Sequence, residues 1–495
     1  MKTNPILCLA ISISLVNLPA RAQNADPSAQ HMQHNMPGMQ HNMPMQPNQV
    51  QPSASTNPAQ QTGPQTPAPD LLKDVSARPP MPLAQFEQFA LATNPTLQQA
   101  NTLVKQSAAQ ARQIGLPPNP VIGYRGEEIR GGEFGGGEQG GFIQQNFVLG
   151  GKLGLRRNIY EQQRREDEIG VTEQRYRILS DVSQSFYSTL AAQRIVEVRK
   201  RLLGLVMDAV ETAHQLANVG QADAPDVLQA EVEAEQAKVD YTTAQRTFLQ
   251  EFHSLAALVG KPDLPAAPLQ GDLEHPPEID PDQIANQIVQ NSPEVKRAQQ
   301  VVIRAEAELK SAKREVIPDL QITAGAQQSF EALSEVNPKP VGFQGFVTAG
   351  ITIPIFNRNQ GNVAAAHADI ERSRAEVSRM QLSLRQNTQP LLQAYLSAQV
   401  EANRYKNEMI PRANRAYELY LTKYRQMGAA YPQVLVSQRT LFQLQVGYIH
   451  ALQQLWVTGV ALKNYTLTDG LGAPTRAGAL GTTINLPTST GGGAQ

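Results

Sequence analysis

Cysteine is almost absent from this chain, which has one cysteine in 495 residues. That residue, Cys8, lies in an apolar run that follows Lys2 and precedes Ala20-Arg21-Ala22. This order of a basic residue, an apolar run and a small-x-small site predicts an export signal over residues 1–22. Because Cys8 lies near the start of the run rather than just after it, we do not expect lipid attachment. Removal of the signal leaves no thiol, which excludes disulfides and thiolate metal ligands.

Long apolar runs are absent outside that signal, and so are the usual marks of an enzyme. No other segment reaches the roughly 18 apolar residues that a membrane-spanning helix needs. The main part of the sequence has no phosphate-binding loop, no paired nucleophile and base, and no cluster of carboxylates with histidines. The formal net charge of −1 offers no basic surface for nucleic acid. We therefore expect no catalysis, no required cofactor and no nucleic-acid binding. We interpret the scattered histidines as ordinary helix or loop residues: His214, His253, His275, His367 and His450.

Large apolar residues other than methionine are scarce between the signal and residue 80. Such a segment cannot bury enough surface to offset its chain entropy, so residues 23–80 are predicted to be disordered. Within it, the six residues Met32–Pro37 return unchanged as Met39–Pro44. Thioether and imidazole ligands without thiolate favour Cu(I) or Ag(I), and the repetition favours metal capture over a mere tether. The candidate ligands are His31, Met32, His34, Met36, Met39, His41, Met43 and Met45.

The remaining chain is a duplication. Pro95 recurs as Pro293 at an offset of 198 residues, and Gly220 recurs as Gly428 at an offset of 208. The second copy has therefore gained ten residues in its middle, where repeats tolerate insertions in loops. The expected organisation is two copies of one unit, residues 81–270 and 271–470, followed by a disordered tail over residues 471–495.

The helical spacing of apolar residues, and the prolines and glycines that end each segment, predict the same elements in both copies. No proline occurs between Lys152 and Pro225, so the long helix of the first copy can reach about 100 Å at 1.5 Å per residue. In the first copy we expect a short helix from about 83 to 115, strands at about 119–130 and 141–149, a long helix over 152–219 and a return helix over about 226–259. In the second we expect a helix over 281–316, strands at about 318–329 and 343–356, a long helix over about 359–427 and a return helix to about 467.

The candidate strands have the length and pattern of membrane strands. Each spans about ten residues, which crosses a bilayer when the strand is tilted. Ile322, Ala324 and Ala326 alternate with polar or small residues. Four strands cannot close a barrel, and lipid does not tolerate open sheet edges, so several chains must share one barrel. The remaining interpretation is two surface hairpins on a soluble helical protein.

The sequence resembles the TolC-type outer-membrane efflux channels over about residues 83–467. The matching motifs are Asn94-Pro95 and Ser292-Pro293 before the short helices, Phe186–Ala192 in the first long helix, and Ile353–Phe356 ending the last strand. The Leu149–Lys152 motif, together with the Met and His segment, is most similar to the heavy-metal branch of CzcC-like and CusC-like proteins.

This resemblance implies a mainly helical protein with membrane strands. It implies a homotrimer with a twelve-stranded barrel in the outer membrane on a long α-helical tunnel across the periplasm. It also implies a periplasmic adaptor and an inner-membrane RND pump as partners, and passive conduction of heavy-metal cations, with copper and silver favoured. Two alternatives stay open: an outer-membrane channel for drug efflux or secretion, and a soluble periplasmic coiled-coil adaptor or structural protein.

The turns at Gly220 and Gly428 are the natural constriction of such a tunnel. The family often has acidic rings there, but the second turn carries Gln433 instead. We therefore expect the gate at Asp223 and Asp226, which alternatively only cap the return helix. The tips that resemble adaptor-contacting tips of the family are Val219, Gly220, Val227, Leu228, Met427, Gly428, Val434 and Leu435.

Overall fold

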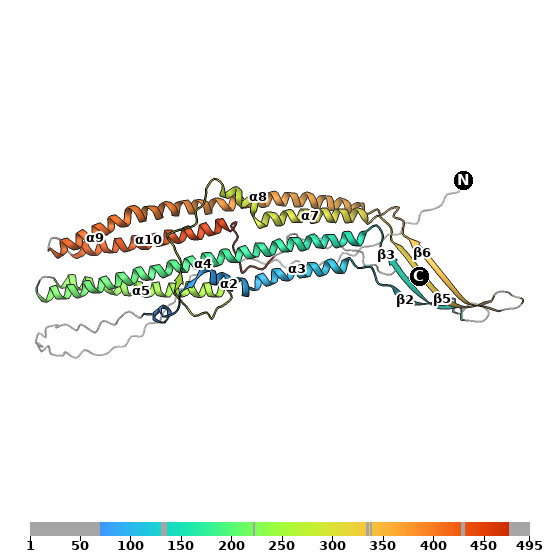
Figure 1. The fold of residues 1–495 in the computed structure, drawn as a ribbon, viewed down its shortest axis with the longest axis horizontal. Coiled ribbons are helices and arrows are strands. Elements are labelled where there is room, and N and C mark those ends of the chain that lie inside the picture. Colours follow the sequence, from blue (N-terminus) through green and yellow to red (C-terminus); the bar gives the residue numbers. More distant parts are fainter. Residues whose placement is uncertain are drawn as a thin grey trace, which may run out of the picture. The chain divides into compact units, whose positions relative to one another are not determined.

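The computed structural model describes residues 70–129, 136–220, 223–332, 336, 339–426 and 431–474. All of them belong to one compact unit, residues 66–495. Within this unit the long helices lie side by side, and the strands labelled β2, β3, β5 and β6 lie beyond one end of them (Figure 1). The Met and His residues of the N-terminal segment lie outside the described residues.

Each copy has the predicted order of short helical segment, two strands, long helical segment and return helix, although several of the predicted helices are divided. The first copy contains α2 (Leu83–Thr93), α3 (Pro95–Ile114), β2 (Val121–Glu127), β3 (Glu138–Phe147), α4 (Lys152–Asn218) and α5 (Ala224–Leu258). The second contains α6 (Ile284–Asn291), α7 (Pro293–Arg314), β5 (Leu320–Ala332), β6 (Pro340–Ile351), α8 (Gln360–Arg404), α9 (Ile410–Arg425) and α10 (Tyr431–Lys463).

Each predicted short helix is in fact two helices, because a capping residue followed by proline interrupts it. Asn94 separates α2 from α3, and its side chain accepts a hydrogen bond of 2.9 Å from the Thr96 amide. Ser292 does the same between α6 and α7 for the Glu294 amide, at 3.2 Å. The single helix predicted over 281–316 is therefore wrong. The proline ring disfavours helical backbone at the residue before it, so Asn94-Pro95 and Ser292-Pro293 each mark the start of a new helix.

The two hairpins join into one antiparallel sheet of order β2-β3-β5-β6. The new contact is the pairing of β3 with β5, in which Ile143 lies opposite Ala324. Among the described strands, β2 and β6 have no partner on their outer sides. The sheet is therefore continuous within the chain but open at both edges.

Two adjacent rows of the sheet, which lie on opposite faces, differ in character: one is apolar and the other is mostly polar. One row crosses the sheet through Ile122, Ile143, Ala324 and Val347, and it is largely exposed, with Ile122 80% and Val347 76% accessible. Successive residues of a strand point to opposite faces. The next row, on the other face, consists of Val121, Gln144, Thr323 and Thr348. The face of Thr323 and Thr348 also carries Phe142 and Phe346, so the alternation in the sheet is as partial as in the sequence.

All four predicted strands occur, but their ends differ from the predicted ends. The strand predicted over 343–356 covers Pro340–Ile351, so the motif with Pro354 lies after the strand instead of ending it. Proline has no amide N–H to donate to a neighbouring strand, which explains this end. The other three strands replace the predicted ranges 119–130, 141–149 and 318–329 with Val121–Glu127, Glu138–Phe147 and Leu320–Ala332.

The first long helix is unbroken and the second is not. Helix α4 has 67 residues, a length of about 100 Å. In the second copy, a π-helical turn over Tyr405–Met409 separates α8 from α9. Pro411 follows at once, and its ring would clash with a carbonyl of the preceding turn, which the wider π turn avoids. The single helix predicted over 359–427 is therefore wrong at this point.

The core follows α4, and its character changes along that helix. Up to Gln174, the buried side chains of α4 are polar or charged, and they meet α3 and α7. From Ile178 onward they are mostly apolar, and Phe186 packs against Phe86 of α2 with ring centroids 5.8 Å apart. Glu166, which is 0% exposed, forms an ion pair with Arg304 of α7 at 3.1 Å. The core around α4 is thus polar and ionic in one part of the helix and apolar in the other.

Both ends of the described chain are more ordered than the sequence predicts. Residues 70–80 contain a short helix, α1 (Lys73–Ser76), and a strand, β1 (Met81–Pro82), pairs with β4 (Leu269–Gln270). Asp70 accepts a hydrogen bond of 3.1 Å from Gln245 of α5. At the other end, residues 464–474 turn back onto α4. The predictions of disorder over 23–80 and 471–495 are therefore wrong for 70–80 and 471–474.

Candidate functional site

The first helical tip is the turn between α4 and α5. Gly220 has φ +73°, a left-handed value that favours glycine, and its amide donates to the Ala217 carbonyl at 3.0 Å. Residues 221 and 222 lie outside the described residues. The expected end of the long helix at Gly220 is therefore correct to within two residues.

Asp223 and Asp226 lie at the start of α5. Asp223 occupies the capping position, with φ −86° and ψ 154°, yet within the described chain its side chain makes no hydrogen bond to the first amides of the helix. Its carbonyl instead accepts from the Asp226 amide at 3.1 Å. Asp223 is exposed and Asp226 half-buried. The Asp223 side chain therefore does not cap α5 in this structure, and neither aspartate is buried.

The second tip, between α9 and α10, carries a buried tyrosine in place of the aspartates. Met427 and Gly428 lie outside the described residues. Tyr431, the first residue of α10, is 6% exposed, and its ring lies 5.5 Å from that of Tyr424. Within the described part of the chain the Tyr431 hydroxyl has no hydrogen-bond partner. Burial raises the pKa of Tyr431 to about 12, and the negative charges of Glu233 and Asp226 add to this effect.

The two tips of one chain adjoin each other. Burial raises the pKa of Tyr424, and the nearby Asp226 carboxylate raises it further. Nearby, Arg439 of α10 forms an ion pair with Glu233 of α5. These partners lie 206 residues apart, and no local pattern in the sequence marks them. The structure thus adds Tyr431, Glu233 and Arg439 to the two aspartates that the sequence singles out.

The apolar residues expected at the tips divide into exposed and buried ones. Val219 is 67% and Leu228 61% exposed, and Val227 is half-buried. Val434 and Leu435 are 5% and 7% exposed, so they pack inside the helical unit. A groove of about 430 Å³ lies beside them between α9 and α10. Its lining is uncharged and consists of Ala413, Ala416, Tyr420, Pro432, Gln433, Val436, Ser437 and Thr440.

The described residues contain no group of three or more His, Cys, Asp or Glu side chains placed to hold a metal ion. Individual histidines pair with a neighbour: His214 with Glu231 at 3.1 Å and His275 with Asp272 at 2.6 Å. Among the helices that the structure describes, none combines the length and apolar character needed to cross a membrane.

Comparison with known proteins adds sequence and fold relatives. A family model described as "Outer membrane efflux protein" matches residues 88–261 and 284–466. The cobalt-zinc-cadmium resistance protein CzcC of Cupriavidus metallidurans is 26% identical over 308 residues, which cover 62% of this chain and 72% of CzcC. The cation efflux system protein CusC of Escherichia coli is 25% identical, over 54% of this chain and 58% of its own. The toluene efflux pump outer membrane protein TtgC of Pseudomonas putida is 27% identical, over 43% and 42%.

Solved structures share the fold. A crystal structure of CusC superposes with a TM-score of 0.61 at 19% identity, covering 79% of this chain and 92% of CusC. The outer-membrane channel OprN superposes with a TM-score of 0.62 at 15% identity, covering 83% of this chain and 99% of OprN. At such identities the likeness concerns the fold alone.

Proposed function

The chain belongs to the outer membrane efflux protein family, and we propose that it conducts heavy-metal cations, with copper and silver favoured, from an inner-membrane RND pump and a periplasmic adaptor to the exterior. It is an outer-membrane efflux channel of the tripartite type that extends into the periplasm, and it is not an enzyme.

The observation that supports a membrane channel is the sheet, which has an apolar row and two open edges. Lipid leaves main-chain N–H and C=O groups at a sheet edge without partners, so an open sheet must close with others. We propose that three chains contribute twelve strands to one barrel, with the row of Ile122, Ile143 and Val347 facing lipid. The assembly would extract only with detergent and migrate as a heat-sensitive trimer. A soluble adaptor, the alternative of another class, would extract with buffer alone.

Two neighbouring residues of β6 offer a matched test of the lipid-facing side. Val347 belongs to the apolar row and Thr348 to the polar one, and both are exposed. A lysine on the lipid-facing side near the bilayer centre costs about 2–4 kcal/mol. Val347→Lys should therefore abolish the trimer in the outer membrane, whereas Thr348→Lys should assemble normally. Equal behaviour of the two variants would overturn the assignment of faces.

The gate is proposed at the first tip. Asp223 and Asp226 of three chains would form a ring of carboxylates at the narrow end of the tunnel, which attracts cations. Asp223→Asn/Asp226→Asn should lower cation block and cation selectivity in planar bilayer recordings. Asp208→Asn, on an exposed face of α4, serves as the control. An unchanged channel in the double variant would remove these aspartates from the gate.

Adaptor contact is proposed for the exposed apolar residues of the tips. Val219 and Leu228 carry the contact at the first tip, with Gly220 and Val227 beside them, and Val436 carries it at the groove between α9 and α10. Met427 and Gly428 stay in the proposal, while the burial of Val434 and Leu435 gives them an indirect role. Leu228→Asp should weaken co-purification with the adaptor. Leu382→Asp, 68% exposed on α8, should not. Equal binding by both variants would contradict the assignment.

Metal specificity is proposed from the repeated Met and His motif, supported by the resemblance to relatives named for metal resistance. Sulfur and imidazole ligands suit Cu(I) and Ag(I), and no further cofactor is needed. Replacing Met32, Met36, Met39, Met43 and Met45 with leucine should abolish Cu(I) uptake by the purified protein, whereas Met409→Leu should not. If the variant with all five methionines replaced takes up Cu(I) undiminished, the segment is only a tether and not a metal site.

A second candidate is export of organic compounds, which the similarity to TtgC favours. The two candidates predict opposite phenotypes in a deletion strain. Loss of the protein should lower copper or silver tolerance under our proposal, and tolerance to toluene under the alternative. Growth assays with both challenges distinguish them.

A further inference from the structure

The chain turns sharply where α10 ends and then crosses back over the first copy. Tyr465, Thr466 and Asp469 have φ of 60°, 60° and 65°, all in the left-handed region. Residues other than glycine and asparagine seldom adopt this region, and they keep it only where the surroundings hold them there. Tyr465 itself packs edge-on against Tyr176 of α4, with ring centroids 5.2 Å apart, and the residues that follow the turn make further contacts.

Those contacts centre on the main chain of Gly470. Its amide donates to Asp181 Oδ2 at 2.6 Å. Its carbonyl oxygen lies 2.8 Å from both Thr96 Oγ1 and Gln174 Nε2. Thr96 is the second residue of α3, and Gln174 and Asp181 lie on one face of α4, seven residues apart. Both hydrogen-bonding groups of Gly470 are thus satisfied by side chains of the first copy, although the residue itself follows the last helix of the second.

Residue 470 also has no room for a side chain. A Cβ added to Gly470 would lie 2.8 Å from Ile178 Cα and 3.0 Å from Ile178 N. These are main-chain atoms of α4, which cannot turn away as a flexible side chain does. The segment therefore fits against α4 only with glycine at this position.

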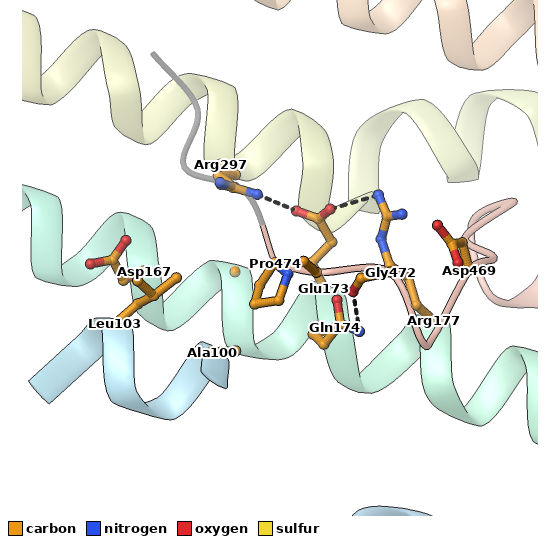
Figure 2. Close-up of a pocket in the computed structure, with 12 residues that line it drawn as sticks. Ala100, Leu103, Asp167, Glu173, Gln174, Arg177, Arg297, Asp469, Gly472 and Pro474 are labelled. Atoms are coloured by element: carbon orange, nitrogen blue, oxygen red, sulfur yellow. Dashed lines mark hydrogen bonds and ion pairs between the residues drawn. The ribbon is translucent and has the colours of Figure 1, made fainter. Parts of the chain in front are cut away.

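Arg177 extends the contact to α7. Its guanidinium donates to the Thr468 carbonyl at 3.2 Å and pairs with Glu173 at 2.8 Å and Glu294 at 3.0 Å. Figure 2 shows Glu173 between Arg177 and Arg297, with Gly472 and Pro474 passing beside them. A cavity of about 210 Å³ remains beneath these residues. The segment thus covers a site between the two copies that is lined by charged side chains of α4 and α7 and by Ala100 and Leu103 of α3.

We propose that Thr468–Pro474 is a strap that fastens the second copy to the first and fixes the end of α10 relative to α4. The strap contacts α4 near Ile178, which lies 40 residues, or about 60 Å, from the end of the helix at Asn218. A helix tip that moves must then pivot about the strap. This consequence rests on the proposed channel function, whereas the strap itself does not.

The test uses the full-length protein with two readouts. Gly470→Ala and Asp181→Ala should each raise amide hydrogen exchange in residues 464–474 at least tenfold. Asp181→Asn keeps an acceptor oxygen for the Gly470 amide and should exchange as the unmodified chain does. Gly204→Ala, at an exposed site on α4 with no neighbouring atom within 4 Å, controls for the loss of a glycine. In bilayer recordings the first two variants should raise open-channel conductance, and the two controls should not.

The outcomes separate the inference from the proposed function. Unchanged exchange in Gly470→Ala and Asp181→Ala overturns the strap. Faster exchange without any change in conductance overturns its role as a pivot. If the unmodified protein forms no channel, the proposed function fails, while the exchange measurement still decides whether the strap exists.

Discussion

Lys152 Nζ lies 2.6 Å from Asp319 Oδ1 and joins the first residue of α4 to the residue before β5. The Lys152 side chain is only 4% exposed and also donates to the Ile317 carbonyl at 2.9 Å. The Leu149 amide donates to the same carboxylate oxygen at 3.1 Å. One carboxylate of the second copy thus holds the strand-to-helix junction of the first.

Asp319→Ala should destabilise this junction strongly. It leaves the buried Lys152 ammonium without its counter-charge, which typically costs about 3–5 kcal/mol for a buried pair. Chemical denaturation of the detergent-solubilised protein measures the loss. Glu418→Ala, which breaks an exposed pair with Arg415, should cost about 1 kcal/mol or less. Equal losses in the two variants would contradict the account of the junction.

Breaking the ion pair between Arg439 and Glu233 should loosen the tips. The pair joins α10 to α5 beside the Tyr424 and Tyr431 rings, and Glu233 is mostly buried. We expect Arg439→Ala to increase conductance in planar bilayers, and the charge swap Arg439→Glu/Glu233→Arg to restore the original value in part. Arg194→Ala, which removes a pair between neighbours on α4, should leave conductance unchanged. A larger effect of Arg194→Ala would exclude this contact from the gate.

Two glycines in helices should respond differently to alanine. Alanine gains about 1 kcal/mol over glycine in an exposed helix interior, so Gly204→Ala should stabilise the protein by roughly that amount. A Cβ at Gly447 would lie 3.0 Å from the ring of Tyr405, the first residue of the π turn. Gly447→Ala should therefore lose the gain or reverse it. Thermal unfolding of both variants in one detergent provides the comparison.

Stability should fall at high pH through Tyr187, whose ring stacks on Trp456 with centroids 3.6 Å apart. Burial first, and then the charges of Glu87 and Asp272, raise the pKa of Tyr187 to about 12. A raised pKa favours the protonated form in the folded state, so this contribution is complete below about pH 10 and is lost as the pH rises through 12. Ultraviolet titration should show late-ionising tyrosines, Tyr187 and Tyr431 among them, and Tyr187→Phe should remove one. An unchanged titration in that variant would contradict the prediction.

Much of the fold could be predicted because its signals are local. Asn94-Pro95 and Ser292-Pro293 mark helix starts by the backbone preferences of capping residues and proline, and Gly220 marks a turn by its left-handed φ. The pairing of β3 with β5 could not be derived in this way. Its register depends on contacts between residues more than 170 positions apart, such as Ile143 and Ala324.

The candidate site was predictable only in part, for the same physical reason. Asp223 and Asp226 stand out because acidic residues beside a turn form a local pattern. Glu233 and Arg439 form an ordinary pair on two separate helices, and only packing brings them together. Gly470 has no distinguishing neighbours in the sequence, and its importance comes from the main chain of Ile178 beside it.

The contact between β3 and β5 gives the sheet two unlike borders, β2 from the first copy and β6 from the second. Two identical chains that meet through β6 of one and β2 of the other use different surfaces, so the contact is heterologous and can repeat around an axis until the ring closes. Every such joint would pair a strand of the second copy with one of the first, as the seam inside the chain already does. Because of the duplication, the pairing between chains would then resemble the pairing of β3 with β5 within one chain.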